Sequence, residues 1–520
     1  GSEVERILRT VDATFLLVDA YEGPMPQTKF VLSKSLALGL PVMVVINKID
    51  KPTARPNEVL DLTFDLFAKL GATDKQLDFP YIYTIAKQGI AILDLKDEHK
   101  DLTPLLDFIV KHVPLASADT TKPFRMQPAT LNYNNYFGRM GVGRIVEGKV
   151  KAGDNVWVIA ADGKRRKGKI TKVINFEGIK KVEIAEGLAG DIVSLAGIPD
   201  IYVGETITSD ENAEALPAIR IDPPAVAMHF MVNDSPFNGR EGKYVTTRHI
   251  RDRLLKETET NVGLKVEVSE VTDSFKVYGR GEMHLAVLIE NMRREGFELQ
   301  VSQPQVVMQK IDGVECEPIE QAVVNVPEHL AGKIIELMAA RKGELKDIRT
   351  QNGLSNLEFE VPTRGLLGFH AVFILITRGE GIMYHSFDHF GPYKGPVDKR
   401  SVGSMISGEQ GEAVAYSLWK LQERGPIFVN HGTEIYEGMI IGEHNQGTDI
   451  VVNATKGKKL TNMRASGSDE AIRLTPPEEI TLEKALSYIQ DDEYVEVTPK
   501  SIRLRKKYLS DIDRRRQRRD

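Results

Sequence analysis

The chain has 520 residues, of which 41% are hydrophobic and 27% charged, so it is long enough for several globular domains and is neither disordered, collagen-like nor a coiled coil. Its longest uncharged apolar stretch, residues 39–47, is about half a membrane span, and its single cysteine, Cys316, excludes a disulfide scaffold and a cysteine-rich zinc site and fits the cytoplasm. The net charge of −6 hides an asymmetry, because residues 501–520 carry nine Lys/Arg against three Asp, which suggests a polyanion contact at that end.

Residues 1–115 alternate short apolar strands with helical patterns, which predicts a parallel sheet covered by helices on both faces. The predicted strands are residues 14–19, 41–46 and 80–84, and the predicted helices are residues 27–38, 58–70 and 103–113. Residues 3–11 predict an amphipathic helix with no initiator methionine before it. Because the chain opens inside a regular element, we expect the first part of this domain to be missing.

The rest of the chain divides into four blocks. Short strands rich in Gly and Val predict a small closed β-barrel over residues 120–217. Residues 218–300 and 303–385 each predict a split βαβ module, which is the plan of a ferredoxin-like domain. Residues 386–520 predict a mixed C-terminal domain with helices over 412–423 and 482–489. The expected fold class is therefore a multidomain α/β and α+β protein.

The sharpest motif is Asn47-Lys48-Ile49-Asp50, directly after the predicted strand 41–46. Ligands of open α/β sheets bind beyond the carboxyl ends of the strands. A carboxylate at Asp50 can accept two hydrogen bonds from guanine, from N1–H and from the exocyclic amine, whereas adenine offers no such pair of donors. Asn47 can brace the loop and touch the acceptor edge of the base, and the Lys48 stem can lie over the ring. The motif predicts a guanine-binding loop; the alternative is an ordinary strand-to-loop turn.

A phosphate-binding loop needs Gly-x-x-x-x-Gly-Lys-Ser/Thr at the start of a helix. The nearest match is residues 143–150, which end in Val150 instead of Ser or Thr and lie between two β segments. We interpret this segment as a hairpin of the barrel. The 520 residues thus predict a loop that recognises the base but no loop that binds the phosphates.

Two basic segments near the C-terminus are candidates for RNA contact. The loop 456–466 combines four cations with hydrogen-bonding side chains and a glycine, which suits phosphate and sugar contacts as well as a solvated surface loop. The tail is a basic run compatible with a helix, or else disordered. The predicted RNA-binding residues are Lys456, Lys458, Lys459, Asn462, Arg464, Arg503, Arg505, Lys506 and Lys507.

No residue pattern predicts a metal site or a catalytic nucleophile. His385 and His389 have an i, i+4 spacing, but no Glu-flanked helix supports it and Gly391-Pro392 follow, which favours solvent or interface histidines. Cys316 lies in no nucleophile pattern and predicts a half-buried structural thiol.

Taken together, the motifs resemble the BipA (TypA) family of translational GTPases, relatives of elongation factor G and LepA. Val18-Asp19-Ala20, Gly23-Pro24-Met25-Pro26-Gln27-Thr28 and Asn47-Lys48-Ile49-Asp50 look like the second half of a G domain. Residues 143–153 resemble a turn of domain II, residues 279–285 and 293–297 resemble domain III, and residues 362–369 resemble domain V. Residues 432–439 and 458–466 are similar to the C-terminal domain peculiar to BipA.

The resemblance implies a ribosome-dependent GTPase that uses GTP/GDP with Mg²⁺. It implies a partial G domain over 1–115, domain II over 120–217, domain III over 218–300, domain V over 303–385 and a BipA-specific domain over 386–520. Expected partners are both ribosomal subunits at the A site, rRNA and the acceptor end of tRNA, in a monomer linked to large-subunit assembly and stress adaptation. It also implies that the amide of Ala86, in Thr84-Ile85-Ala86-Lys87, contacts the base.

The family's phosphate loop, its Mg²⁺-binding switch threonine and its catalytic histidine match no residue here. We therefore expect these 520 residues to bind GTP weakly and not to hydrolyse it, because several charge-assisted phosphate contacts, roughly 1.5–3 kcal/mol each, are lost. Whether the chain is an enzyme is left open. The alternatives are a non-catalytic ribosome- and RNA-binding fragment and a LepA-like factor.

Overall fold

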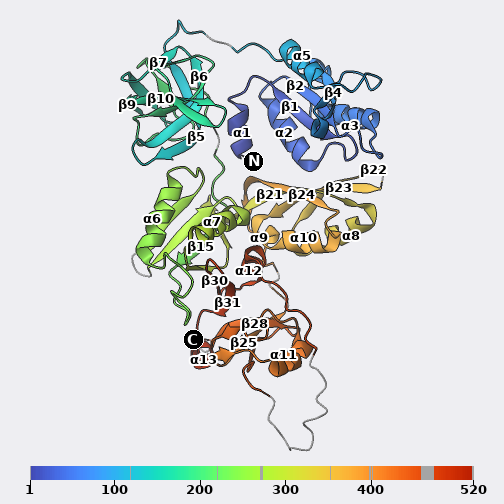
Figure 1. Ribbon diagram of the computed structural model, residues 1–520, viewed down its shortest axis with the longest axis vertical. Helices are drawn as coiled ribbons and strands as arrows, with labels where there is room; N and C mark the ends of the chain where they lie inside the picture. Colours follow the sequence, from blue (N-terminus) through green and yellow to red (C-terminus); the bar gives the residue numbers. More distant parts are fainter. Residues whose placement is uncertain are drawn as a thin grey trace, which may run out of the picture.

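The computed structural model describes residues 2–116, 119–219, 221–269, 273–351, 353–397, 400, 402–457 and 473–517. An N-terminal domain (residues 2–116) and a β domain (119–219) lie side by side at one end of the elongated molecule (Figure 1). Two α+β modules follow in the middle, and the C-terminal block forms the other end. Within the described residues, no helix has both the length and the apolar character needed to cross a bilayer.

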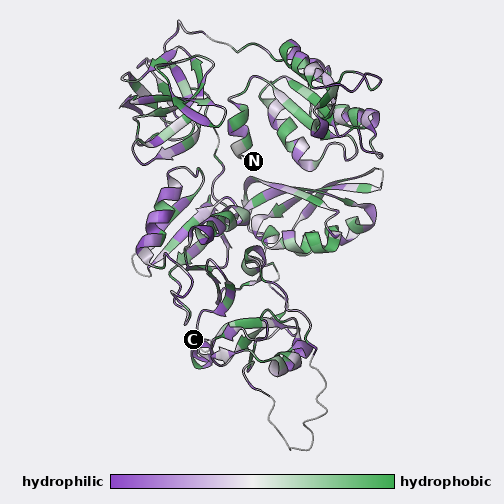
Figure 2. Cartoon of the chain, viewed as in Figure 1, coloured by the Kyte–Doolittle hydropathy of each residue, from purple (hydrophilic) through white to green (hydrophobic). Residues whose placement is uncertain are grey.

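The N-terminal domain is built on a four-stranded sheet in the order β1-β2-β3-β4. The central strand Val-Met-Val-Val-Ile-Asn is buried on both faces, as the continuous apolar run predicts, and hydrophobic residues mark the strands in Figure 2. The first three strands are parallel, but β4 is antiparallel to β3 and is too short to be recognised in the sequence. The elements are α1 (Ser2–Leu8), β1 (Thr14–Asp19), α2 (Pro26–Ala37), β2 (Val42–Asn47), α3 (Pro56–Lys69), α4 (Asp74–Leu77), β3 (Tyr81–Ile85), the 3-10 helix η1 (Ala86–Gln88), β4 (Ile90–Ile92) and α5 (Thr103–His112).

The β domain is an eight-stranded curved sheet, β11-β10-β13-β6-β5-β14-β8-β9, with the small ladder β12-β7 beside it. Its edge strands β11 and β9 are not paired with each other in the described residues, so the hydrogen bonding does not close the predicted barrel. The segment that resembles a phosphate loop is strand β6, a turn at Gly148 (φ +74°) and strand β7. The strands are β5 (Arg125–Asn134), β6 (Gly138–Glu147), β7 (Lys149–Lys151), β8 (Asn155–Ile159), β9 (Arg165–Lys169), β10 (Lys172–Glu177), β11 (Lys180–Glu183), β12 (Glu186–Leu188), β13 (Ile192–Ala196) and β14 (Thr206–Thr208).

Two α+β modules follow, and their strands are arranged in the same way. The first has the strand order β16-β17-β15-β18, and the second has β22-β23-β21 with β24 on the far side of β21. Their elements are β15 (Val226–Met231), α6 (Thr247–Thr258), β16 (Lys265–Ser269), β17 (Ser274–Gly279), α7 (Glu282–Glu295), β18 (Leu299–Ser302), β19 (Gln305–Val306), β20 (Gln309–Ile311), β21 (Val314–Pro327), α8 (Glu328–Ala340), β22 (Glu344–Gln351), β23 (Leu354–Pro362), α9 (Thr363–Leu366), α10 (Phe369–Thr377) and β24 (Ile382–Pro392).

The predicted boundary between residues 385 and 386 is wrong, because it cuts strand β24. That strand pairs with β21 from Cys316↔Pro392 to Asn325↔Ile382 and so belongs wholly to the second module. His385 and His389 lie on this strand, where Glu320 pairs with His385 and Asp388 with His389. In the part of the chain that the structure describes, no group of three or more His, Cys, Asp or Glu side chains is placed to hold a metal ion.

The C-terminal block is joined to the first module by backbone hydrogen bonds, which the sequence did not predict. Strand β30 pairs with β18 from Leu299↔Val497 to Ser302↔Tyr494, so that one sheet runs from the module into the block. The elements are β25 (Gly403–Ser407), β26 (Gly411–Glu412), α11 (Ala415–Leu421), the 3-10 helix η2 (Gln422–Arg424), β27 (Glu434–Ile435), β28 (Met439–His444), β29 (Ile450–Val452), α12 (Leu482–Tyr488), β30 (Glu493–Val497), β31 (Ile502–Lys506) and α13 (Asp511–Gln517).

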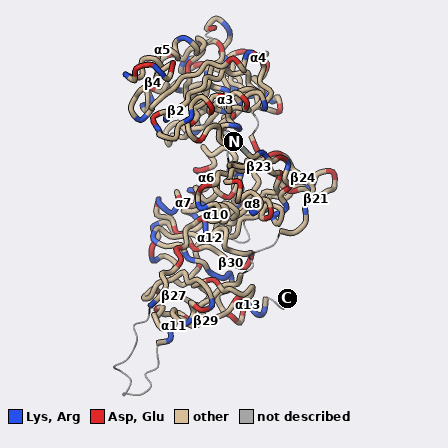
Figure 3. The backbone as a smooth tube through the Cα atoms, turned by 90° about the vertical axis from the view of Figure 1, so that its right-hand side faces the viewer, with Lys and Arg blue, Asp and Glu red and all other residues tan. Residues whose placement is uncertain are grey.

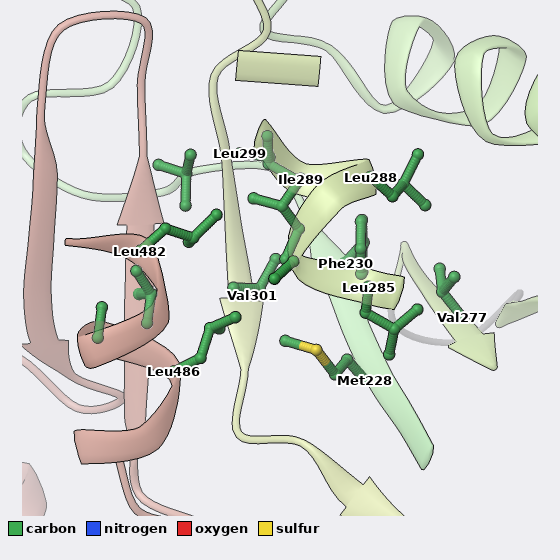
Figure 4. Packing of buried hydrophobic residues seen from close by; sticks show 14 of the residues in the cluster. Met228, Phe230, Val277, Leu285, Leu288, Ile289, Leu299, Val301, Leu482 and Leu486 are labelled. Carbon is green, nitrogen blue, oxygen red and sulfur yellow. The ribbon is translucent and has the colours of Figure 1, made fainter. Parts of the chain in front are cut away.

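The same joint has a shared hydrophobic core. Leu482 and Leu486 of α12 belong to the cluster that also holds Phe230, Ile289 and Val301 of the first module. Figure 4 shows both leucines pointing toward Val301, across the strand where the module meets the C-terminal block. The module and the C-terminal block therefore share one core.

We expect Leu486→Ala to destabilise the first module as well as α12, by about 2–5 kcal/mol, because it leaves a cavity in that common core. Hydrogen exchange followed by mass spectrometry should show lost protection in β15, β17 and β18 together with α12. Leu375→Ala, at a residue 78% exposed, is the matched control and should change little. Loss of protection confined to residues 473–517 would contradict the shared core.

Candidate functional site

The parallel register of the N-terminal sheet brings three polar residues to one edge. Asp19 of β1 lies opposite Asn47 of β2, and Asn47 lies opposite Thr84 of β3. All three stand at the carboxyl ends of their strands, which is where open α/β sheets bind ligands. The predicted motif therefore begins on the last residue of a buried strand and continues into the loop beyond it.

Asn47 braces the loop that follows β3. Its Oδ1 accepts one hydrogen bond from the Thr84 hydroxyl and one from the backbone amide of Ala86, each 3.1 Å long. Asn47 was expected to brace the loop that carries the motif, and these contacts join it to the neighbouring loop after β3. The amide of Ala86, expected to contact the base, is instead engaged by Asn47. The Asn47 Nδ2 has no hydrogen-bond acceptor among the described residues and is free to donate to a ligand.

Lys48 holds the loop from the other side. Its backbone has φ +64°, a left-handed conformation that is uncommon for a residue other than glycine and tends to occur at functional sites. Its Nζ lies 2.6 Å from Oδ2 of Asp19, and the Lys51 Nζ lies 3.2 Å from the same oxygen. The extended Lys48 stem thus spans the space between the ends of β1 and β2.

Asp19 contributes to this loop although it lies outside the motif Asn47-Lys48-Ile49-Asp50. Burial alone would raise the pKa of Asp19, but hydrogen bonds from Lys48, from the Tyr21 amide and from Lys51 outweigh it and hold this pKa well below its usual range. The same interaction raises the pKa of Lys48. A carboxylate at the end of the neighbouring parallel strand was the signal available in the sequence.

The last two residues of the motif face opposite ways. Ile49 is partly buried and packs against the core of the sheet, which fixes the loop. Asp50 is exposed, and no hydrogen bond or ion pair from the described residues reaches its carboxylate. The loop therefore presents one uncommitted carboxylate, one amide and a lysine stem at the same edge of the sheet.

A cavity of about 660 Å³ lies elsewhere in this domain, between β3, β4 and α5. It is lined by Tyr81, Leu93, Asp107, Phe108 and Lys111 among others, and none of the motif residues reaches it. This cavity is therefore separate from the loop that carries the motif.

The predicted RNA-binding residues of the tail are mostly inside the protein. Residues 502–506 form strand β31, not a helix. Arg505 and Lys506 are each 1% exposed, so direct RNA contact by these two side chains is a wrong prediction. Lys506 lies 2.7 Å from Asp449 and 2.8 Å from Glu493, while Arg505 is paired with Asp234 and Gln300.

Arg503 is also engaged, since it lies 2.8 Å from Glu496 and is paired with Glu241. Lys507, the next cation along the chain, is exposed. Lys456 is exposed as well, at the edge of the C-terminal block. Lys458, Lys459, Asn462 and Arg464 lie outside the described residues.

We expect Lys48→Met to raise the pKa of Asp19, because the largest of the contacts that lower it is removed. In the unaltered chain the ionised Asp19 carboxylate stabilises the folded loop at pH values above the ordinary pKa of an aspartate, about 3.9. This stabilisation is lost as the pH falls from there toward the lowered pKa of Asp19 in the folded protein. Carboxyl ¹³C NMR titration measures the shift. Lys48→Arg should keep the low pKa, and so should Lys69→Met on the outside of α3. An unchanged pKa in Lys48→Met would contradict the assigned cause.

Comparison with known proteins identifies the family. Residues 1–115 match the Elongation factor Tu GTP binding domain, residues 138–208 match Elongation factor Tu domain 2, residues 314–401 match Elongation factor G C-terminus, and residues 402–511 match the TypA/BipA C-terminal domain. Over 518 residues the chain is 50% identical to "Large ribosomal subunit assembly factor BipA" of Escherichia coli (strain K12), covering 99% of this chain and 85% of that protein. The chain belongs to the BipA (TypA) family of translational GTPases.

Further relatives carry the same name. The protein of Synechocystis sp. is 50% identical over 97% of this chain and 85% of its own, and that of Bacillus subtilis (strain 168) is 48% identical over 99% and 84%. A solved structure from Thermus thermophilus is 16% identical over 76% of this chain and 85% of its own, with a TM-score of 0.48. The match of residues 402–511 to the TypA/BipA domain disfavours the LepA-like alternative, and it starts after β24, in keeping with the corrected boundary.

Proposed function

We propose that this chain is a ribosome-associated factor of BipA type, which reads guanine nucleotides with the loop Asn47–Asp50 and acts in assembly of the large ribosomal subunit. The observation that carries the proposal is the uncommitted Asp50 carboxylate at the carboxyl edge of the sheet, in a loop held by Asn47 and Lys48. The relatives named large ribosomal subunit assembly factor, identical at about half of all positions, support the cellular role.

The chemistry of the base explains why this arrangement selects guanine. Guanine offers N1–H and the exocyclic amine side by side, and one carboxylate accepts both. Adenine has an acceptor at N1, so it would leave Asp50 with an unsatisfied oxygen, a cost of about 1–3 kcal/mol. The free Asn47 amide group donates to the acceptor edge of the base, and the Lys48 stem covers one face of the ring.

GTP and GDP with Mg²⁺ are the ligands that the family implies, and these 520 residues fit only the base. No Gly-x-x-x-x-Gly-Lys-Ser/Thr segment occurs in them to hold the phosphates. We therefore infer that affinity is millimolar or weaker and that this polypeptide by itself does not hydrolyse GTP. The alternative function is a ribosome- and RNA-binding platform without turnover.

On the ribosome we infer contacts with the A-site region, rRNA and the acceptor end of tRNA, made by a cytoplasmic monomer with a role in stress adaptation. Exposed Lys456 and Lys507 support RNA contact by the C-terminal block. Phosphate release measured with ribosomes tests the inference about hydrolysis: we expect none from these 520 residues alone. Ribosome-stimulated turnover by these residues would overturn both that inference and the platform alternative.

We expect Asp50→Asn to lower the affinity for guanosine nucleotides roughly 10- to 100-fold, since the amide N–H₂ now faces the guanine amine. Affinity for xanthosine nucleotides should rise, because their C2 oxygen accepts from that N–H₂. Ligand-observed NMR detects millimolar binding by the unaltered chain and its loss in Asp50→Asn. Asp65→Asn, on the exposed face of α3, is the matched control. Equal guanosine affinities in Asp50→Asn and the unaltered chain would overturn the proposed base contact.

A further inference from the structure

The loop between β2 and α3, residues 48–55, carries the Asp50 carboxylate in two successive turns. The N–H of Lys51 donates a 3.2 Å hydrogen bond to the carbonyl of Lys48, and the N–H of Ala54 donates one of 2.9 Å to the carbonyl of Lys51. Figure 3 shows both basic and acidic residues in the N-terminal domain around the labels β2 and α3, the two elements that this loop joins. Asp50 lies inside the first turn, so its direction depends on how firmly the turns are held.

Apolar contacts hold this loop on the sheet but do not orient Asp50. Ile49 and Ala54 are partly buried and pack against the core of the N-terminal domain. Hydrophobic contacts are not directional, so they fix the depth of the loop without fixing the rotation of the carboxylate. No hydrogen bond or ion pair from the described residues reaches that carboxylate. Its orientation therefore depends on directional contacts made by neighbouring residues of the loop.

Lys51, the residue directly after Asp50, attaches the loop to the end of β1. Its Nζ lies 3.2 Å from Oδ2 of Asp19 and 5.8 Å from the centroid of the Tyr21 ring, a cation–π arrangement. The Tyr21 N–H in turn donates a 2.9 Å hydrogen bond to Oδ1 of Asp19. The segment after β1 is therefore held by Asp19, and Lys51 joins the loop to that segment.

Arg55 fastens the far end of the loop to the same segment. Its Nε donates a 3.1 Å hydrogen bond to the Tyr21 carbonyl, and its backbone N–H donates one of 2.9 Å to the Ala20 carbonyl. Its Nη1 also lies 2.5 Å from Oε1 of Glu58, in the first turn of α3. Surface ion pairs contribute little stability, so the pair with Glu58 does not account for the contacts that Arg55 makes with the neighbouring segment.

We propose that Lys51 and Arg55 are positioning residues for guanine recognition, because they hold the loop so that both oxygens of Asp50 face the two donors of the base. Two parallel hydrogen bonds require a fixed direction of the carboxylate, and a small displacement is enough to lose one of them. The alternative is that both cations serve only the stability of the domain. The proposal rests on the proposed function and names the residues that set its selectivity.

Inosine monophosphate (IMP) tests the direction of the Asp50 carboxylate, because it lacks the exocyclic amine of guanosine monophosphate (GMP) and can donate only from N1–H. The two ligands share ribose and phosphate, so contacts with those groups cancel in the ratio of affinities. Titrations followed by the methyl signals of Ile49 and Ile85 measure both affinities. We expect the unaltered chain to prefer GMP roughly 10-fold, the effect of one hydrogen bond to a charged group, and the double variant Lys51→Met, Arg55→Ala to prefer it about 2-fold or less.

Further variants separate positioning from stability. Each of the two substitutions alone should give an intermediate preference, and the conservative pair Lys51→Arg, Arg55→Lys should keep part of it. Glu58→Ala breaks the ion pair at the start of α3 but leaves the contact between Arg55 and Tyr21, so it should keep most of the preference, as should Lys69→Met. An equal loss in Glu58→Ala would assign the effect to α3 and overturn the positioning role.

The failure of this proposal is distinguishable from the failure of the proposed function. If the unaltered chain does not prefer GMP, or if Asp50→Asn binds GMP as well as the unaltered chain does, the proposed base contact fails and the positioning role fails with it. If Asp50→Asn loses GMP binding while the double variant keeps the 10-fold preference, only the positioning role of Lys51 and Arg55 is overturned.

Discussion

The in-register pairing of β1, β2 and β3 is the constraint on which the base-reading loop depends. Because the three strands run parallel and end together, Asp19, Asn47 and Thr84 meet at one edge. A slip of one residue would turn each of these side chains to the opposite face of the sheet and break the contacts that hold the loop. The buried side chains of β2 make such a slip costly, so the hydrophobic core of this domain also sets the geometry of the site.

At the joint between the first module and the C-terminal block, a buried charged network adds to the shared apolar core. Glu496 is fully buried and accepts hydrogen bonds from Asn233 and Ser235 of the first module, both 3.0 Å long, and from Tyr436 at 2.8 Å. Removing one partner from such a network leaves a buried charge uncompensated, which is strongly destabilising. Together with the β18–β30 ladder, these contacts hold the C-terminal block against the first module.

The sequence predicted those features that depend on residues close to one another along the chain. The elements of the N-terminal domain follow from apolar runs and helical periodicity, and the position of Asn47–Asp50 follows from the end of a buried strand. Arg505 and Lys506 were misread because their partners, such as Asp234 and Asp449, are far away in the sequence. Asp19 was missed as the partner of Lys48 for the same reason. The helix predicted over residues 412–423 is shorter in the structure, where α11 has seven residues and the 3-10 helix η2 follows it.

The central claim is that the loop after β2 recognises guanine through Asp50. The most direct measurement is a methyl NMR titration of the isoleucine-labelled protein with guanosine and with adenosine, since Ile49 lies within the loop and Ile85 beside it. The account predicts that guanosine shifts the Ile49 and Ile85 signals in a saturable way and that adenosine leaves them in place. Equal responses to the two nucleosides, or no response to guanosine, would contradict it.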